Sequence, residues 1–279
     1  MGMNDGGSRM EINFAKRIVV KVGTSTITYE NGRMNLGNID RLCRALADLM
    51  NAGKEVILVT SGAIGVGIGC LNLPERPTSV REKQAIASVG QCELMNAYMR
   101  SFSEYSYACG QILLTKDDLL DNLTKSNITN TFEALLEKRI IPVVNENDSV
   151  STAEILHNGT FGDNDTLSAH VACIVNADLL IILSDIDGLY DDNPRENPDA
   201  KRISYVDEIT PEMLQFASGA GSKLGTGGMH TKITAMQKVT SHGISGVIAE
   251  GSDPHVLSKV LDCEDIGTFF LAKEPVVGK

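Results

Sequence analysis

The sequence predicts an α/β protein built around a largely parallel sheet, and three observations support this fold class. Short apolar runs of strand length alternate with stretches of helical periodicity. No repeat, low-complexity tract or Pro/Ser-rich linker divides the 279 residues. A hydrophobic content of 42% with 22% charged residues is ordinary for a chain with a substantial core. We expect one continuous domain over residues 15–279, preceded by a flexible, Gly-rich tail over residues 1–14.

The first elements follow from apolar patterning. Residues 17–22 (RIVVKV) form a buried strand. A helix follows, ending at Gly53, because apolar residues recur at the spacing of one helix face: Ile39, Leu42, Leu46 and Leu49. Residues 54–60 form the next strand, and a Gly-rich turn then leads into a long helix over residues 79–103.

The same alternation continues to the end of the sequence. We expect further strands at residues 110–114, 140–144, 179–183 and 246–249. We expect further helices near residues 117–138, 165–176, 229–242 and 254–261. Residues 194–198 and 219–228 are rich in Pro or Gly, which predicts surface loops within the domain.

Charge and composition exclude several classes of protein. A formal net charge of −11 is unsuited to nucleic acid binding, which needs a clustered positive surface. The longest apolar runs have strand length, so we expect no membrane span, and the N-terminus does not resemble a secretory signal. The six cysteines form no C-x-x-C pair, and His170 with Cys173 fits core packing better than a zinc site. We expect a cytoplasmic protein without a protein-bound metal site.

Polar residues follow four of the predicted strands at their carboxyl ends. These residues are Lys21 with Gly23, residues 60–62 (TSG), residues 145–148 (NEND), and Ser184 with Asp185. Strands must end in polar turns in any case, which accounts for any one of these segments. Four together favour a ligand site, because open α/β sheets bind ligands at the edge where the strand ends meet.

Two Gly-rich loops can present backbone N–H groups to an anion. They are residues 61–67 (SGAIGVG) and residues 225–232 (GTGGMHTK), and neither matches the P-loop or the G-x-G-x-x-G fingerprint. The second loop leads into Lys232, and the first strand carries Lys21, so two cations can face one phosphate group. Phosphoryl transfer needs such positive charge together with in-line positioning.

Carboxylates flank the same predicted site. Residues 162–165 (GDND) stand at the start of a predicted helix, where Asp163 or Asn164 can equally be an N-cap. Capping does not explain the second acidic cluster at residues 145–148. Two lysines and a carboxylate therefore indicate phosphoryl transfer.

Five runs of residues, in this order, resemble the motifs of the glutamate 5-kinases. They are residues 20–24 (VKVGT), 59–64 (VTSGAI), 145–148 (NEND), 162–165 (GDND) and 225–229 (GTGGM). The likeness covers residues 16–270, and residues 187–190 (DGLY) resemble the nucleotide-side hairpin of amino acid kinases. The NEND run is the feature that separates this family from aspartate, uridylate and acetylglutamate kinases.

The resemblance implies a three-layer α/β/α sandwich that transfers phosphate from ATP, with Mg²⁺, to the γ-carboxylate of L-glutamate, the first step toward proline. It implies that Lys21 and Lys232 neutralise the transferring phosphoryl group and that Asp165 holds both lysines. Glutamate would be bound by Ser61, Asp148 and Asn164. The nucleotide would be held by Ser184, Asp185, Thr226, Gly227, Gly228, Met229, His230, Thr231 and Lys232.

Three features depart from the family pattern. His230 stands where a small residue such as Ser is usual, and residues 157–161 lengthen the loop at 151–162 before Gly162. The sequence ends at residue 279, which implies the form without the RNA-binding-like PUA module. The family also implies a homodimer or homotetramer and feedback inhibition by L-proline. Two alternatives remain open: an amino acid kinase with a different acceptor, and a non-catalytic amino-acid sensor on the same fold.

Overall fold

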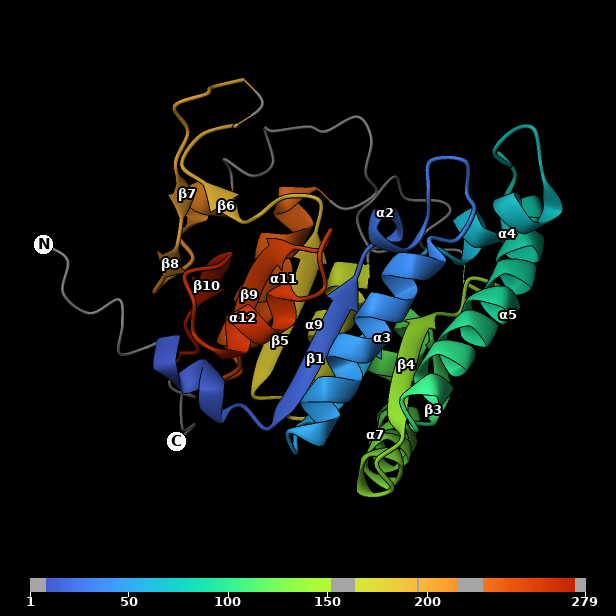
Figure 1. The fold of residues 1–279 in the computed structure, drawn as a ribbon, viewed down its shortest axis with the longest axis horizontal. Helices are drawn as coiled ribbons and strands as arrows, with labels where there is room; N and C mark the ends of the chain where they lie inside the picture. Colours follow the sequence, from blue (N-terminus) through green and yellow to red (C-terminus); the bar gives the residue numbers. More distant parts are fainter. Residues whose placement is uncertain (1–8, 152–163, 195, 215–227, 274–279) are drawn as a thin grey trace, which may run out of the picture.

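A computed structural model describes residues 9–151, 164–194, 196–214 and 228–273. Within these ranges, eight strands form one sheet in the order β3-β4-β2-β1-β5-β9-β10-β8, and β6 pairs with β7 in a separate two-stranded sheet. Figure 1 shows the main sheet running across the molecule with helices in front of it and behind it. The predicted α/β fold with a mostly parallel central sheet is confirmed.

The bounds of the elements are as follows. The strands are β1 (Arg17–Val22), β2 (Glu55–Val59), β3 (Cys109–Leu114), β4 (Ile141–Glu146), β5 (Leu179–Ser184), β6 (Leu189–Tyr190), β7 (Arg202–Ile203), β8 (Tyr205–Val206), β9 (Ser245–Glu250) and β10 (Thr268–Phe270). The helices are η1 (Met10–Phe14), α2 (Thr24–Ile27), α3 (Leu36–Asn51), α4 (Ala63–Leu71), α5 (Val80–Glu104), α6 (Lys116–Leu120), α7 (Asn122–Glu137), α9 (Asn164–Ile174), α11 (Met229–Thr240) and α12 (Val256–Leu261).

Strand β1 lies at the centre of the sheet and pairs in parallel with β2 and β5. Strands β4 and β3 extend the parallel sheet beyond β2, and β9 extends it beyond β5. Only one pairing in this sheet, β10 with β9, is antiparallel among the described strands. All six predicted strands and all six predicted helices have counterparts in the structure, and their bounds lie within a few residues of those expected, except that two helices replace the one expected over residues 117–138.

Two apolar clusters cover the two faces of the sheet. One contains Val20 and Val143 of the sheet together with buried side chains of α3, α5 and α12. The other contains Val19 and Val144 together with buried side chains of α7, α9 and α11. Because successive side chains of a strand point to opposite faces, this alternation makes the molecule three layers thick, α/β/α.

Several details differ from the sequence prediction. The Gly-rich turn expected after β2 is mostly helix α4, and the single helix expected over 117–138 is divided into α6 and α7 at Asp121. The last part of the expected flexible tail is folded, because η1 follows Arg9, whose buried side chain binds backbone carbonyls near β8 and β10. None of the described helices combines the length and apolar character needed to cross a membrane.

Candidate active site

The carboxyl ends of four neighbouring strands meet at one edge of the sheet. These strands are β4, β2, β1 and β5, which stand side by side in the sheet and run parallel. The polar segments predicted at this edge therefore come from adjacent strands. Helices α2 and α4 lie at the same end of the molecule, at the top of the view in Figure 1.

A buried carboxylate joins two lysines at this edge. Lys21 Nζ lies 2.6 Å from Asp165 Oδ1, and Lys232 Nζ lies 3.1 Å from Asp165 Oδ2. Asp165 is fully buried, and the two lysines are only 6% and 5% exposed. Sequence positions 21, 165 and 232, which come from three separate motifs, are thus brought together as expected.

The fold places each of these three side chains. Lys21 follows Val19 by two positions on β1, so it points to the α9 and α11 face of the sheet. Asp165 lies in the first turn of α9, and Lys232 lies in the first turn of α11. Both helices begin at the carboxyl edge of the sheet, which brings their first turns to the end of β1.

Electrostatics keep the central carboxyl ionised. Burial by itself opposes the ionisation of Asp165, yet the ammonium groups of Lys21 and Lys232 outweigh that effect and hold the pKa of Asp165 well below its usual range. Thr231 Oγ1 donates a further hydrogen bond to Asp165 Oδ2 at 3.1 Å. The buried unit of Lys21, Asp165 and Lys232 carries two positive charges and one negative charge, so it suits an anionic ligand.

The loop between β2 and α4 lies beside the end of β1. Ser61 Oγ is 3.1 Å from Thr24 Oγ1 and donates to the carbonyl oxygen of Val22 at 3.3 Å. Gly62 then caps α4 with φ of 96°, a left-handed conformation that glycine adopts without strain. The first N–H groups of α4 have no partner within the helix, so they are available to a carboxylate.

Two further predicted substrate residues are buried at the same edge. Asp148 follows β4, and Asn164 begins α9 beside Asp165. Asn164 Oδ1 is buried and has no hydrogen-bond partner among the described residues. Burial raises the pKa of the neighbouring Glu146; the hydrogen bond from Ser151 opposes that shift, and the charge of Asp148 adds to it.

The predicted nucleotide residues fall on two segments. Ser184 ends β5 and donates from Oγ to Asp185 Oδ1 at 3.1 Å. Gly228 and Met229 open α11, and the exposed His230 has its Nδ1 3.3 Å from the carbonyl oxygen of Leu214. Thr231 and Lys232, also in the predicted nucleotide set, are described above. Thr226 and Gly227 of that set lie outside the described residues. So do Asp163 and most of the loop at 151–162.

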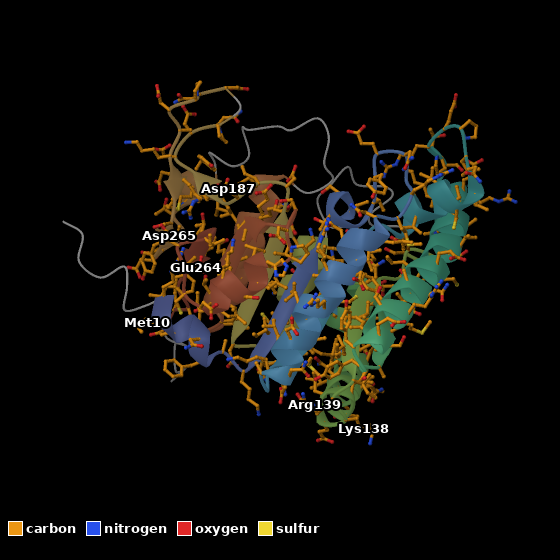
Figure 2. All side chains as sticks on the ribbon, viewed as in Figure 1. Met10, Lys138, Arg139, Asp187, Glu264 and Asp265 are labelled. Carbon is orange, nitrogen blue, oxygen red and sulfur yellow. The ribbon has the colours of Figure 1, made fainter. Side chains whose placement is uncertain are left out.

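A hairpin extends from the β5 side of the site. It is formed by β6 and β7, and Tyr190 donates a hydrogen bond to Asp187 Oδ1 at 2.9 Å. Figure 2 shows Asp187 in the upper half of the molecule, away from Lys138 and Arg139 at the bottom. The residues 187–190 that resemble a nucleotide-side hairpin therefore lie toward the same end as the site.

Sequence reasoning missed Gln91 and did not assign a role to Thr24. Gln91 of α5 accepts a hydrogen bond from Asn145, the first residue of the NEND run, across 54 positions of sequence. The sequence pattern could have indicated Gln91, because it is a polar residue on a helix face otherwise formed by apolar side chains such as Ala87, Leu94 and Tyr98.

Within the described ranges, no three His, Cys, Asp or Glu side chains gather in a way that could hold a metal ion. Asp165, the most deeply buried carboxylate of the site, is already engaged by two ammonium groups. Mg²⁺ commonly keeps several waters and is bound by substrate phosphates rather than by a protein cage. This side-chain set therefore fits a magnesium ion that enters with a nucleotide.

Relatives of high similarity share one description. The glutamate 5-kinase of Clostridium perfringens is 56% identical over 266 residues, which is 95% of this chain and 99% of that protein. The glutamate 5-kinase of Enterococcus faecalis is 51% identical, over 94% of this chain and 97% of that protein. The glutamate 5-kinase of Clostridium tetani is 54% identical, over 92% and 95% respectively.

Solved structures agree with the fold. The T. acidophilum isopentenyl phosphate kinase has a TM-score of 0.61 at 17% identity, covering 91% of this chain and all of that chain. The UMP kinase from Bacillus anthracis has a TM-score of 0.61 at 12% identity, covering 93% and 97%. The model of the amino acid kinase family matches residues 16–250. With these matches and the identity of about half to the relatives above, the chain belongs to the amino acid kinase family and, within it, to the glutamate 5-kinases.

Proposed function

We propose that this protein catalyses ATP-dependent phosphorylation of the γ-carboxylate of L-glutamate, giving L-glutamyl 5-phosphate and ADP, the first step of proline biosynthesis. The observation that carries the proposal is the buried unit of Lys21, Asp165 and Lys232 at the carboxyl edge of the sheet. The high identity to glutamate 5-kinases over nearly the whole chain supports this choice of acceptor.

The reaction needs charge stabilisation more than covalent help. A γ-carboxylate oxygen of glutamate is ionised at neutral pH, so it attacks the γ-phosphorus without a general base. One O–P bond forms as the bond to the ADP oxygen breaks. Lys21 and Lys232 neutralise the charge on the transferring group, and Asp165 holds the two ammonium groups in position.

Glutamate would be bound between the loop after β2 and the start of α9. The hydroxyl of Ser61 and the first N–H groups of α4 suit carboxylate oxygens. Asp148 and Asn164 suit the α-ammonium group, because both offer acceptor oxygens. Asn164 Oδ1 is buried and has no hydrogen-bond partner in the described part of the chain, which supports this assignment.

The nucleotide would occupy the β5 and α11 side. Ser184 and Asp185 would contact it from the end of β5, and Thr226, Gly227, Gly228, Met229, His230, Thr231 and Lys232 from the loop and the helix start. A helix N-terminus favours phosphate through its free N–H groups and dipole. The nucleotide would bring Mg²⁺ with it, and when bound this ion would offset negative charge on the phosphates.

Regulation, assembly and location extend this proposal. L-Proline shares the α-carboxylate and α-amine of glutamate, so we expect it to compete for the glutamate pocket. We expect a homodimer or homotetramer, which light scattering would measure. All six cysteines are free, which supports a reducing cytoplasmic location.

The proposal is tested by measuring ADP release from Mg-ATP with L-glutamate, L-aspartate, N-acetylglutamate and UMP as separate acceptors. Hydroxylamine is added to trap an acyl phosphate as its hydroxamate. We expect glutamate-dependent ADP together with hydroxamate. Activity with another acceptor would overturn the substrate, and inactivity with all four would favour a sensor.

A further inference from the structure

Two buried amides, Asn145 of β4 and Gln91 of α5, lie side by side at the segment after β4 that is proposed to bind glutamate. Asn145 of β4 points to the same face of the sheet as Val143, which packs with α5. Its Nδ2 donates to Gln91 Oε1 of α5 at 2.8 Å. Asn145 is 1% exposed and Gln91 is 8% exposed, so water does not compete freely for this pair.

Each amide has one polar atom for which the described residues supply no partner. Among the described residues, Asn145 Oδ1 and Gln91 Nε2 make no hydrogen bond. Leaving a buried polar group unsatisfied is costly, and such groups in a native fold call for a specific explanation. A ligand that supplies a donor to Asn145 Oδ1 would remove part of that cost.

The position of the pair points to the amino acid substrate. Asn145 begins the strand-end segment that includes Asp148, a proposed ligand of the α-ammonium group. Gly90, next to Gln91, packs against the carbonyl of Ala63 at the start of α4, which a Cβ on Gly90 would approach to 1.8 Å. The pair therefore lies between the two segments proposed to hold glutamate.

Hydrogen bonding couples the orientations of the two amides. Turning either amide alone would place two NH₂ groups or two oxygens against each other, so the amides can only turn together. With both turned, Asn145 would present a donor, which an ammonium group cannot use. In the observed orientation Asn145 presents an acceptor, as Asn164 does. An α-ammonium group has three N–H donors, and Asp148 supplies the third acceptor.

We propose that Gln91 is a positioning residue that holds the Asn145 amide with its oxygen toward the substrate, and thereby gives the site its selectivity for a free α-ammonium group. This inference rests on the proposed glutamate kinase activity. Gln91 itself does not touch the reacting atoms; it acts through Asn145.

The test compares glutamate with glutarate, which keeps both carboxylates and lacks the α-ammonium group. The quantity measured is the ratio of the inhibition constant of glutarate to the KM of glutamate. In Gln91→Met we expect this ratio to fall roughly 10- to 100-fold, because the KM of glutamate rises while glutarate is unaffected. The KM of ATP should stay unchanged. Gln91→Ser, too short to reach Asn145, is the second variant and should give the same loss.

Two further variants separate positioning from general stability. Tyr98 lies on the same face of α5 as Gln91, and Tyr98→Phe removes its buried hydrogen bond with Thr60. This variant should lower thermal stability and leave the ratio as in the wild type. Gln91→Glu keeps an acceptor oxygen for Asn145 Nδ2, so the ratio should stay close to that of the wild type.

Three results would overturn the inference. If the ratio is unchanged in both Gln91→Met and Gln91→Ser and the wild type turns over glutamate, Gln91 does not position Asn145. The proposed kinase activity is then unaffected. An equal loss of glutamate and glutarate affinity assigns Gln91 a merely structural role. Absence of glutamate turnover in the wild type overturns the proposed substrate, and this inference with it.

Discussion

Asp165 is the residue on which the site depends most. Asp165→Asn removes the charge between two buried ammonium groups and keeps the side-chain shape. We expect the free energy of unfolding to fall by about 3–5 kcal/mol, as when one partner of a buried ion pair is removed, and kcat to fall with it. Denaturant unfolding and steady-state kinetics measure the two effects.

The matched control for Asp165→Asn is Asp265→Asn. Asp265 also meets two cationic side chains, Arg9 and Arg202, but its side chain is 66% exposed. Exposed pairs contribute about 0–1 kcal/mol, so this variant should retain stability and turnover. Equal losses in the two variants would contradict the importance of burial at Asp165.

Glu146 gives a prediction about pH. Burial raises its pKa in the folded state above the unfolded value, so the folded state favours the protonated carboxyl. Stability is therefore lost as pH rises through the folded pKa. We expect Glu146→Gln to be more stable than the wild type at pH 8, with the difference vanishing near pH ~4.

Urea unfolding at several pH values measures this difference. Glu208→Gln serves as the control, because Glu208 is exposed and its hydrogen bond with Lys273 lowers its pKa. It should show no gain at pH 8. A Glu146→Gln difference that did not change with pH would contradict the burial argument.

At the scale of elements, the packing of α4 on α5 depends on the absence of side chains. Glycine disfavours helix, which is why residues 61–67 were expected to form a turn. Tertiary packing reverses that preference, since a Cβ at Gly67 would lie 2.2 Å from the carbonyl oxygen of Ile86. The strands were predictable because they are continuous buried apolar runs, whereas α4 depends on contacts that local sequence does not contain.

Gly90→Ala tests this close approach. Its Cβ would lie 1.8 Å from the Ala63 oxygen and 2.4 Å from the Gly67 nitrogen, so we expect a loss of about 1–3 kcal/mol or more in the free energy of unfolding. Gly37→Ala in α3 is the matched control, because its nearest contact is 3.8 Å away. It should stabilise the protein by about 0.5–1 kcal/mol. A neutral Gly90→Ala would contradict the packing described.

At the scale of the whole molecule, Arg9 links the start of the described chain by hydrogen bonds to the edge of the sheet formed by β8 and β10. Its Nη1 donates to the Glu264 carbonyl and its Nη2 to the Ser204 carbonyl, each at 2.7 Å. Figure 2 shows Met10 near Glu264 and Asp265 at the same side of the molecule. The sequence did not reveal this link, because the two partners lie 195 and 255 positions away.

We expect Arg9→Met to lower the thermal midpoint, with a cost of about 1–3 kcal/mol, because it leaves carbonyl oxygens without their donors. Met10→Ala is the control, since Met10 is 63% exposed. Calorimetry on the whole protein measures both. An unchanged midpoint in Arg9→Met would show that this edge does not need the link.

The candidate site was more predictable than its surroundings. Parallel strands share one carboxyl edge, so Lys21, Ser61, Asp148 and Ser184 could be brought together from sequence alone. The sequence pattern predicted that Lys21 and Lys232 face one phosphate group, whereas the role of Asp165 in holding both lysines followed only from the family resemblance. The contact between Gln91 and Asn145 could not be foreseen, because it depends on how α5 is rotated against the sheet.

The most direct measurement is turnover of Lys21→Ala and Lys232→Ala beside the equilibrium affinity of each variant for glutamate. If both lysines stabilise the transferring phosphoryl group, kcat should fall about 10²- to 10³-fold in each variant while glutamate affinity changes little. Lys238→Ala on α11 should behave as the wild type. Wild-type turnover in either Lys21→Ala or Lys232→Ala would contradict the assignment of the phosphoryl-transfer site.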